Sequence, residues 1–260
     1  MNRLLLRLVP ALGLLAIGCK RSPPPSDAPL HVAAAADLAE AFPEVGAAFE
    51  KATARKVVFS FGASGMLEQQ IAHGAPFDVF AAANASFVDD AIAAGACDAD
   101  TKTPYAEGRI VIWTRGDGSA SPASLADLAR PEVLHVAIAN PEHAPYGRAA
   151  KEALVRSGVW DAVSRKVVYG ENIQQTLQFA QSGNADVAIV AQSLAGGSGG
   201  RAVPIDPALY APLVQAIVVC HGGAAPRSPL DADARRFTAF VTSGEGRSIL
   251  KRFGFATSPR

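Results

Sequence analysis

The chain has 260 residues, 49% of them hydrophobic, so it is long enough to bury a large core in one large domain or two smaller ones. It carries 24 basic and 24 acidic residues, and no basic patch or charge run stands out. This balance argues against a nucleic acid as the partner.

The N-terminal residues have the pattern of an export signal. Arg3 and Arg7 provide a positive start, residues 8–17 form an apolar stretch too short to span a bilayer, and the small Gly18 precedes Cys19. Because a cysteine directly follows the small residue, the segment L-L-A-I-G-C resembles a bacterial lipoprotein box. The pattern therefore predicts a protein that leaves the cytoplasm.

A lipoprotein box implies that residues 1–18 are a signal peptide and that Cys19 is lipidated and becomes the new N-terminus. Ala16 stands where Leu is usual in that motif, so secretion into the periplasm without a lipid is the alternative. The Pro-rich segment 19–29 has no apolar period, and we expect it to be an extended tether between a membrane anchor and the folded body.

The folded part begins with two strands that lead through small residues into helices. An apolar strand starts at Leu30, and Asp37 with Glu40 resembles a capping box at the start of the following helix. A second strand, residues 57–61, leads through G-A-S-G into a helix that begins near Ser64. The first N–H groups of such helices lack intrahelical partners and lie at the positive end of the helix dipole, so the turns predict an anion site. Ser64 would add a hydroxyl donor, unless it only caps its own helix.

Strands and helices alternate along the rest of the chain. This alternation predicts an α/β fold with mostly parallel sheets that have helices on both faces. Another helix is predicted from about Ile173. The further predicted strands are residues 78–84, 109–115, 135–140, 166–170, 186–191 and 214–220.

Two of these apolar runs are predicted to be extended crossings between two lobes, at residues 109–114 and 215–220. A cleft between lobes joined in this way can close on a ligand about hinges at the crossings. The predicted first lobe is residues 30–112 with 217–260, and the predicted second lobe is residues 113–216.

Several motifs together resemble one known family, the periplasmic molybdate-binding proteins of ABC importers. The resemblance extends over nearly everything from Leu30 to Phe255, and the order and spacing of its motifs make it specific. It implies a type II periplasmic binding protein fold, in which two α/β lobes hold a tetrahedral oxyanion in the cleft by backbone N–H groups and neutral hydroxyls. The motifs are V-A-A-A-A-D-L, S-F-G-A-S-G, G-A-P-F-D-V-F-A-A-A from Gly74, N-P-E-H-A-P-Y-G from Asn140 and R-F-G-F from Arg252.

The resemblance also implies the ligand and its contacts. The expected ligand is molybdate, with tungstate as a second, and no cofactor or direct metal ligand is expected. The expected partners are an importer permease and, through a lipid on Cys19, a membrane; the protein is expected to be a monomer. Carried over by position, the oxyanion-binding residues are Ala36, Asp37, Ser64, Tyr146 and, through its backbone N–H, Ile173.

Asp37 departs from the family pattern, because many members have Ser or Asn there. One branch also has a ligand Tyr where this chain has Ala191. A carboxylate facing a dianion would repel it, so we expect Asp37 to bond its own helix start and Tyr146 to replace the missing hydroxyl. Alternatively, Asp37 accepts a hydrogen bond from a protonated ligand such as hydrogen phosphate, and the chain binds phosphate or another oxyanion.

A serine hydrolase is the competing class of function. Ser64 could form a triad with an Asp and one of the five histidines, but G-A-S-G followed by Met66 is not the G-x-S-x-G nucleophile elbow. Metal chemistry is disfavoured because the histidines lie far apart and the cysteines show no C-x-x-C pattern. Cys97 and Cys220 could pair in an oxidising compartment, but the sequence does not supply the distance between them.

Overall fold

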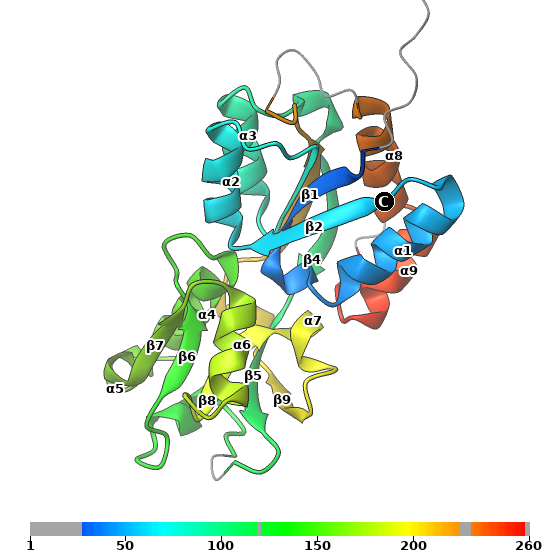
Figure 1. The fold of residues 1–260 in the computed structure, drawn as a ribbon. Coiled ribbons are helices and arrows are strands. Elements are labelled where there is room, and N and C mark those ends of the chain that lie inside the picture. Colours follow the sequence, from blue (N-terminus) through cyan, green and yellow to red (C-terminus); the bar gives the residue numbers. More distant parts are fainter. Residues whose placement is uncertain (1–27, 119–120, 224–229, 258–260) are drawn as a thin grey trace, which may run out of the picture.

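The computed structural model describes residues 28–118, 121–223 and 230–257, which form two lobes, each built on one five-stranded sheet (Figure 1). The predicted signal peptide, Cys19 and most of the predicted tether lie outside the described residues. Within these ranges, no helix is both long and apolar enough to cross a membrane.

The first lobe contains the sheet with strand order β2-β1-β3-β10-β4. Strand β1 pairs parallel with β2 and β3, whereas β10 pairs antiparallel with β3 and β4. The strands are β1 (Leu30–Ala35), β2 (Val57–Gly62), β3 (Val79–Ala82), β4 (Thr103–Gly108) and β10 (Leu213–Val219).

Helices cover both faces of this first sheet, as the alternating pattern predicts. In Figure 1, α2 and α3 lie on one face, and α1, α8 and α9 lie on the other. Strand β3 has every residue buried, which is usual for a central strand of a sheet covered on both sides. The helices are α1 (Ala41–Thr53), α2 (Ser64–Ala72), α3 (Ala85–Ala93), α8 (Asp231–Val241), α9 (Gly244–Arg252) and the 3-10 turns η1 (Ala36–Leu38) and η2 (Ala99–Thr101).

The second lobe repeats this arrangement with strand order β7-β6-β8-β5-β9. Strand β6 pairs parallel with β7 and β8, and β5 pairs antiparallel with β8 and β9. Its strands are β5 (Ile110–Arg115), β6 (Val136–Ala139), β7 (Val167–Gly170), β8 (Val187–Ala191) and β9 (Gly200–Pro204). Its helices and 3-10 turns are α4 (Pro145–Arg156), α5 (Trp160–Val163), α6 (Ile173–Gln181), α7 (Gln192–Ala195), η3 (Leu125–Ala129), η4 (Ser164–Lys166) and η5 (Pro207–Leu209).

The chain changes sheets earlier than the predicted lobe boundaries. It leaves the first sheet at Arg109, between β4 and β5, and returns between η5 and β10. The predicted boundaries after residues 112 and 216 therefore fall inside β5 and β10, which are sheet strands rather than crossings. Hydrophobic pattern reveals an apolar run but does not reveal which sheet it joins, and this is the reason for the difference.

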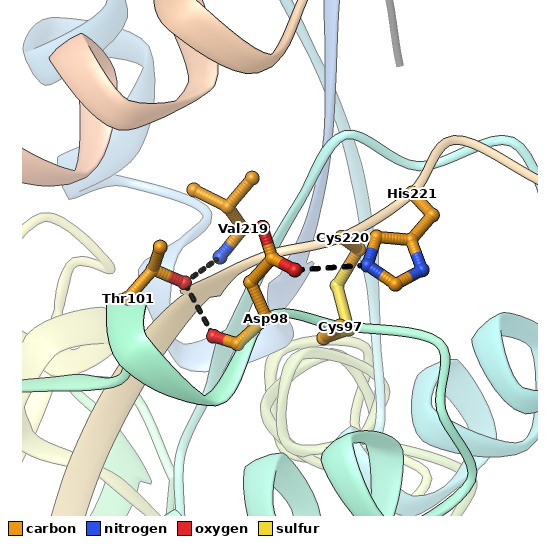
Figure 2. The surroundings of a disulfide bond; sticks show 6 residues. All are labelled: Cys97, Asp98, Thr101, Val219, Cys220 and His221. Atoms are coloured by element: carbon orange, nitrogen blue, oxygen red, sulfur yellow. Dashed lines mark hydrogen bonds and ion pairs between the residues drawn. A yellow bond between two sulfur atoms is a disulfide. The ribbon is translucent and has the colours of Figure 1, made fainter. Parts of the chain in front are cut away.

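A disulfide joins Cys97 to Cys220, so the pairing that the sequence left open does occur (Figure 2). The Thr101 hydroxyl reinforces it, because the oxygen accepts from the Val219 N–H at 2.9 Å and the O–H donates to the Asp98 carbonyl at 2.7 Å. These contacts tie the connection between α3 and β4 to the end of β10. A disulfide is typical of proteins in oxidising compartments outside the cytoplasm.

Candidate functional site

A small hollow lies between the lobes, where several strand-to-helix turns meet. All five predicted oxyanion-binding residues line it, so the structure brings together residues that the sequence spreads over more than half of its length. The hollow has a volume of about 10 Å³, which is close to the space of one water-sized group. The first lobe contributes Ala35, Ala36, Asp37, Gly62, Ala63, Ser64 and Ala83, and the second contributes Ala144, Pro145, Tyr146 and Ile173.

Ser64 is the first residue of α2 and is fully buried. Its Oγ accepts a hydrogen bond from the Ala83 N–H at 3.0 Å, and the N-cap position of α2 belongs to Ala63. The alternative in which Ser64 only caps its own helix is therefore not what the structure contains. Because a hydroxyl has one donor as well as acceptor lone pairs, the Ser64 O–H can donate into the hollow.

Ile173 presents a backbone N–H at the start of α6. The N-cap residue Asn172 accepts from the N–H groups of Gln174 and Gln175, both at 3.0 Å, through its side-chain oxygen. Since the cap occupies the second and third N–H groups of the helix, the first one, of Ile173, is left for another acceptor. Ile173 is 3% exposed and lines the hollow, so that acceptor would have to lie inside the site.

Asp37 is fully buried and takes part in the hydrogen bonding between the lobes. Its Oδ2 accepts from the Tyr146 O–H at 2.9 Å and from Gln215 Nε2 at 2.5 Å. Gln215 Nε2 also donates to the Tyr146 oxygen at 3.1 Å, and the Tyr105 O–H donates to Gln215 Oε1 at 2.6 Å. These four side chains form one buried polar network that spans both lobes.

The two oxygens of Asp37 are treated differently by the fold. Oδ2 accepts two hydrogen bonds, whereas Oδ1 is the buried side-chain atom that has no hydrogen-bond partner among the described residues. Burial raises the pKa of Asp37 from 3.8 to about 6, and the hydrogen bonds from Gln215, from Tyr146 and from the backbone of Asp37 itself only partly oppose that rise. Asp37 is thus a carboxyl group that titrates close to neutral pH.

Two expectations about Asp37 and Tyr146 are corrected by these contacts. The sequence predicts a capping box at Asp37 and Glu40, but the chain forms the turn η1 first and α1 begins at Ala41 with no side-chain cap. The main hydrogen bonds to the Asp37 side chain come from α4 and β10, and the backbone of Asp37 at the start of η1 contributes less. The Tyr146 proton is donated to Asp37 and does not point a spare donor at the hollow in this structure.

Three further contacts hold the lobes together around the hollow. The Gly65 N–H of α2 donates to the His143 carbonyl at 2.9 Å, and the Ser193 hydroxyl of α7 donates to the Asp37 carbonyl at 2.7 Å. The Arg148 guanidinium lies over the Phe87 ring, 4.9 Å from its centre. The structure therefore represents a closed arrangement of the two lobes.

Sequence reasoning missed Gln215, Tyr105 and Ser193. Gln215 did leave a signal, since it is a polar residue inside the apolar run L-V-Q-A-I-V-V and is fully buried. A buried polar side chain needs partners, so its presence in a strand indicates a polar network nearby. Tyr105 and Ser193 carry no comparable signal.

The competing hydrolase arrangement finds no support in the site. Among the described residues, no hydrogen bond joins Ser64 to a histidine, and its recorded partner is the Ala83 N–H. In the same part of the chain, no group of three or more His, Cys, Asp or Glu side chains could hold a metal ion.

Comparison with known proteins gives consistent matches. The family model described as "Bacterial extracellular solute-binding protein" matches residues 30–256. The molybdate-binding protein ModA of Rhodobacter capsulatus is 37% identical over 229 residues, which cover 86% of this chain and 87% of that protein. ModA of Azotobacter vinelandii is 34% identical over 257 residues, which cover 96% of each. The solved structure of the Azotobacter vinelandii periplasmic molybdate-binding protein matches with a TM-score of 0.78 at 27% identity, covering 88% of this chain and 100% of that one.

Proposed function

Because this chain belongs to the family of bacterial extracellular solute-binding proteins, we propose that it binds molybdate outside the cytoplasmic membrane and delivers it to an ABC importer. The observation that carries the proposal is the convergence of Ala36, Asp37, Ser64, Tyr146 and Ile173 on one hollow between the lobes. Two relatives named as molybdate-binding proteins match nearly the whole chain, which supports molybdate as the ligand.

Uncharged donors hold the oxyanion in this proposal. The residues that line the hollow, all in the described part of the chain, include no lysine or arginine. The Ser64 hydroxyl and the backbone N–H groups of Ala36, Asp37 and Ile173 bind the ion instead. Such donors are effective because hydrogen bonds are stronger in a water-poor cleft, and because N–H groups at helix starts carry partial positive charge.

Ion size then provides selectivity. A cleft fitted to the long metal–oxygen bonds of molybdate leaves the smaller sulfate ion with stretched and weaker hydrogen bonds. Tungstate is nearly as large as molybdate, so the site binds both with similar affinity.

Binding requires the lobes to move. The predicted oxyanion-binding residues that line the hollow are all buried in this closed arrangement, so the ligand enters an opened form. The two connections between the sheets, at Arg109 and between η5 and β10, are the natural hinges. Closure buries the ion, and the importer permease recognises the closed, loaded shape.

The protein acts by capture, without catalysis and without a cofactor, as a monomer. Residues 1–18 direct export, and Cys19 carries a lipid that anchors the periplasmic protein to a membrane. The segment L-L-A-I-G-C supports the anchor, and the Cys97–Cys220 disulfide supports an oxidising compartment. Intact mass measurement of protein extracted from membranes tests the lipid on Cys19, and an unmodified Cys19 would refute it.

Titration calorimetry with molybdate, tungstate, sulfate and phosphate tests the ligand. We expect tight and similar binding of molybdate and tungstate, and much weaker binding of sulfate and phosphate. Preference for phosphate would overturn the molybdate assignment, and turnover of an ester that depends on Ser64 would overturn the assignment as a binding protein.

A further inference from the structure

An ionised Asp37 would place a negative charge beside a dianionic ligand and repel it. The elements packed around Asp37 are α4, α6, α7, β2, β4 and β10. The titratable side chains that face it from them, within the described residues, are Tyr146 of α4 and Tyr105 of β4. Burial raises the pKa of both tyrosines well above 10, so they stay neutral. An ionised Asp37 would therefore have no cationic partner in its surroundings.

The hydrogen bonds on Asp37 match a protonated carboxyl. A carboxylic acid has one oxygen that only accepts and one that carries the O–H donor. Oδ2 accepts from both Tyr146 and Gln215, as an accepting oxygen should. Oδ1 accepts from no described group and is fully buried in a residue that lines the hollow. The proton therefore has one favourable position, on Oδ1.

We propose that Asp37 is protonated in the loaded protein, that its Oδ1–H donates a hydrogen bond to an oxygen of the bound oxyanion, and that binding takes up one proton from solvent. This inference rests on the proposed function, because it concerns how the same site accommodates molybdate. The proton comes from water or buffer, the ion keeps its two negative charges, and the carboxyl becomes neutral. Repulsion between two anions is replaced by a hydrogen bond.

The proton is available near neutral pH. Burial, partly opposed by hydrogen bonds, already raises the pKa of Asp37 to about 6 in the ligand-free protein, and a dianion next to it raises the pKa further. Above pH 6, most of the ligand-free protein must take up the proton before or during binding. The affinity should then fall by close to tenfold per pH unit, or on the order of 100-fold between pH 7 and pH 9.

Titration calorimetry of the wild-type protein with molybdate tests this directly. At pH 8, the binding heat measured in two buffers with different ionisation enthalpies should show uptake of about one proton per ion. The affinity should decrease from pH 7 to pH 9 as stated. Unchanged affinity over this range without proton uptake would overturn the inference, and no variant is needed for that result.

Two variants identify the group that takes up the proton. Asp37→Asn keeps an oxygen that can accept from Tyr146 and Gln215 and places a permanent N–H donor in the position of Oδ1, so its molybdate affinity should not depend on pH. Ser64→Ala is the matched control, because it removes a neutral donor and should lower the affinity by the same factor at each pH. A pH dependence that persists in Asp37→Asn would overturn the inference.

Failure of the proposed function would look different. Wild-type protein that binds molybdate at no pH would refute the molybdate assignment, and the inference with it. Tight binding of molybdate with no change in affinity or protonation would leave the function standing and refute only the role of Asp37. Phosphate binding without proton uptake would indicate instead that the ligand supplies the proton, which also refutes the inference.

Discussion

Replacing Asp37 by Asn should make the ligand-free protein relatively more stable as the pH rises from 4 to 6. Burial raises the pKa of this carboxyl from 3.8 to about 6 in the folded protein. The folded state therefore binds the proton more tightly than the unfolded state. The contribution of protonated Asp37 to stability is fully present below about pH 4 and is lost as the pH rises through about 6. A difference of about two pKa units corresponds to roughly 3 kcal/mol of unfolding free energy.

Urea denaturation of both ligand-free proteins between pH 4 and pH 8 measures this effect. Subtracting the wild-type unfolding free energy from that of Asp37→Asn cancels the titration of all carboxyl groups that the two proteins share. The difference should increase by about 2 kcal/mol between pH 4 and pH 6 and level off above about pH 7. A difference that stays flat, or that decreases with pH, would refute the conclusion that burial destabilises the ionised Asp37.

Three further predictions concern other parts of the same molecule. Tyr146→Phe removes the donor to Asp37 and should lower the unfolding free energy at pH 8 by about 1.5–3 kcal/mol, which is the usual contribution of a hydrogen bond to a charged group. An unchanged unfolding free energy in urea denaturation would contradict the bridging role of the hydroxyl. Ser64→Ala should weaken molybdate binding by roughly 10- to 100-fold in calorimetry while circular dichroism stays the same, and unchanged affinity would place Ser64 outside the site. Replacing both Cys97 and Cys220 by Ser should lower the unfolding free energy by up to about 5 kcal/mol in the chain-entropy model. The molybdate affinity should stay the same, because the disulfide lies at the end of the first sheet away from the hollow. A large loss of affinity would contradict that separation.

The sequence predicts the local geometry of the site better than the hydrogen bonds that join its distant residues. Ser64 and Ile173 could be placed at helix starts because small residues, caps and a change in hydrophobic period lie next to them in the chain. Such signals are local, so they survive in a single sequence. The two α/β lobes could be predicted for the same reason.

Contacts between distant residues could not be predicted in this way. Tyr146 lies 109 residues from Asp37, and Gln215 lies 178 residues from it. Whether these side chains meet depends on how the lobes close and which sheet each strand joins, and the local sequence pattern predicts neither. The local pattern predicted only the contact of Asp37 with its own helix start, whereas its main hydrogen bonds come from residues far along the chain.

The path of the chain between the sheets decides the order in which the two lobes can be completed. Every strand of the second sheet lies between residues 110 and 204, whereas β10, which separates β3 from β4 in the first sheet, begins only at Leu213. A chain that emerges with its N-terminus first can therefore finish the second lobe while the first lobe still lacks an inner strand. Cys97 also cannot form this disulfide until Cys220 appears. The first lobe, in which the folded chain begins, is thus the last to be completed.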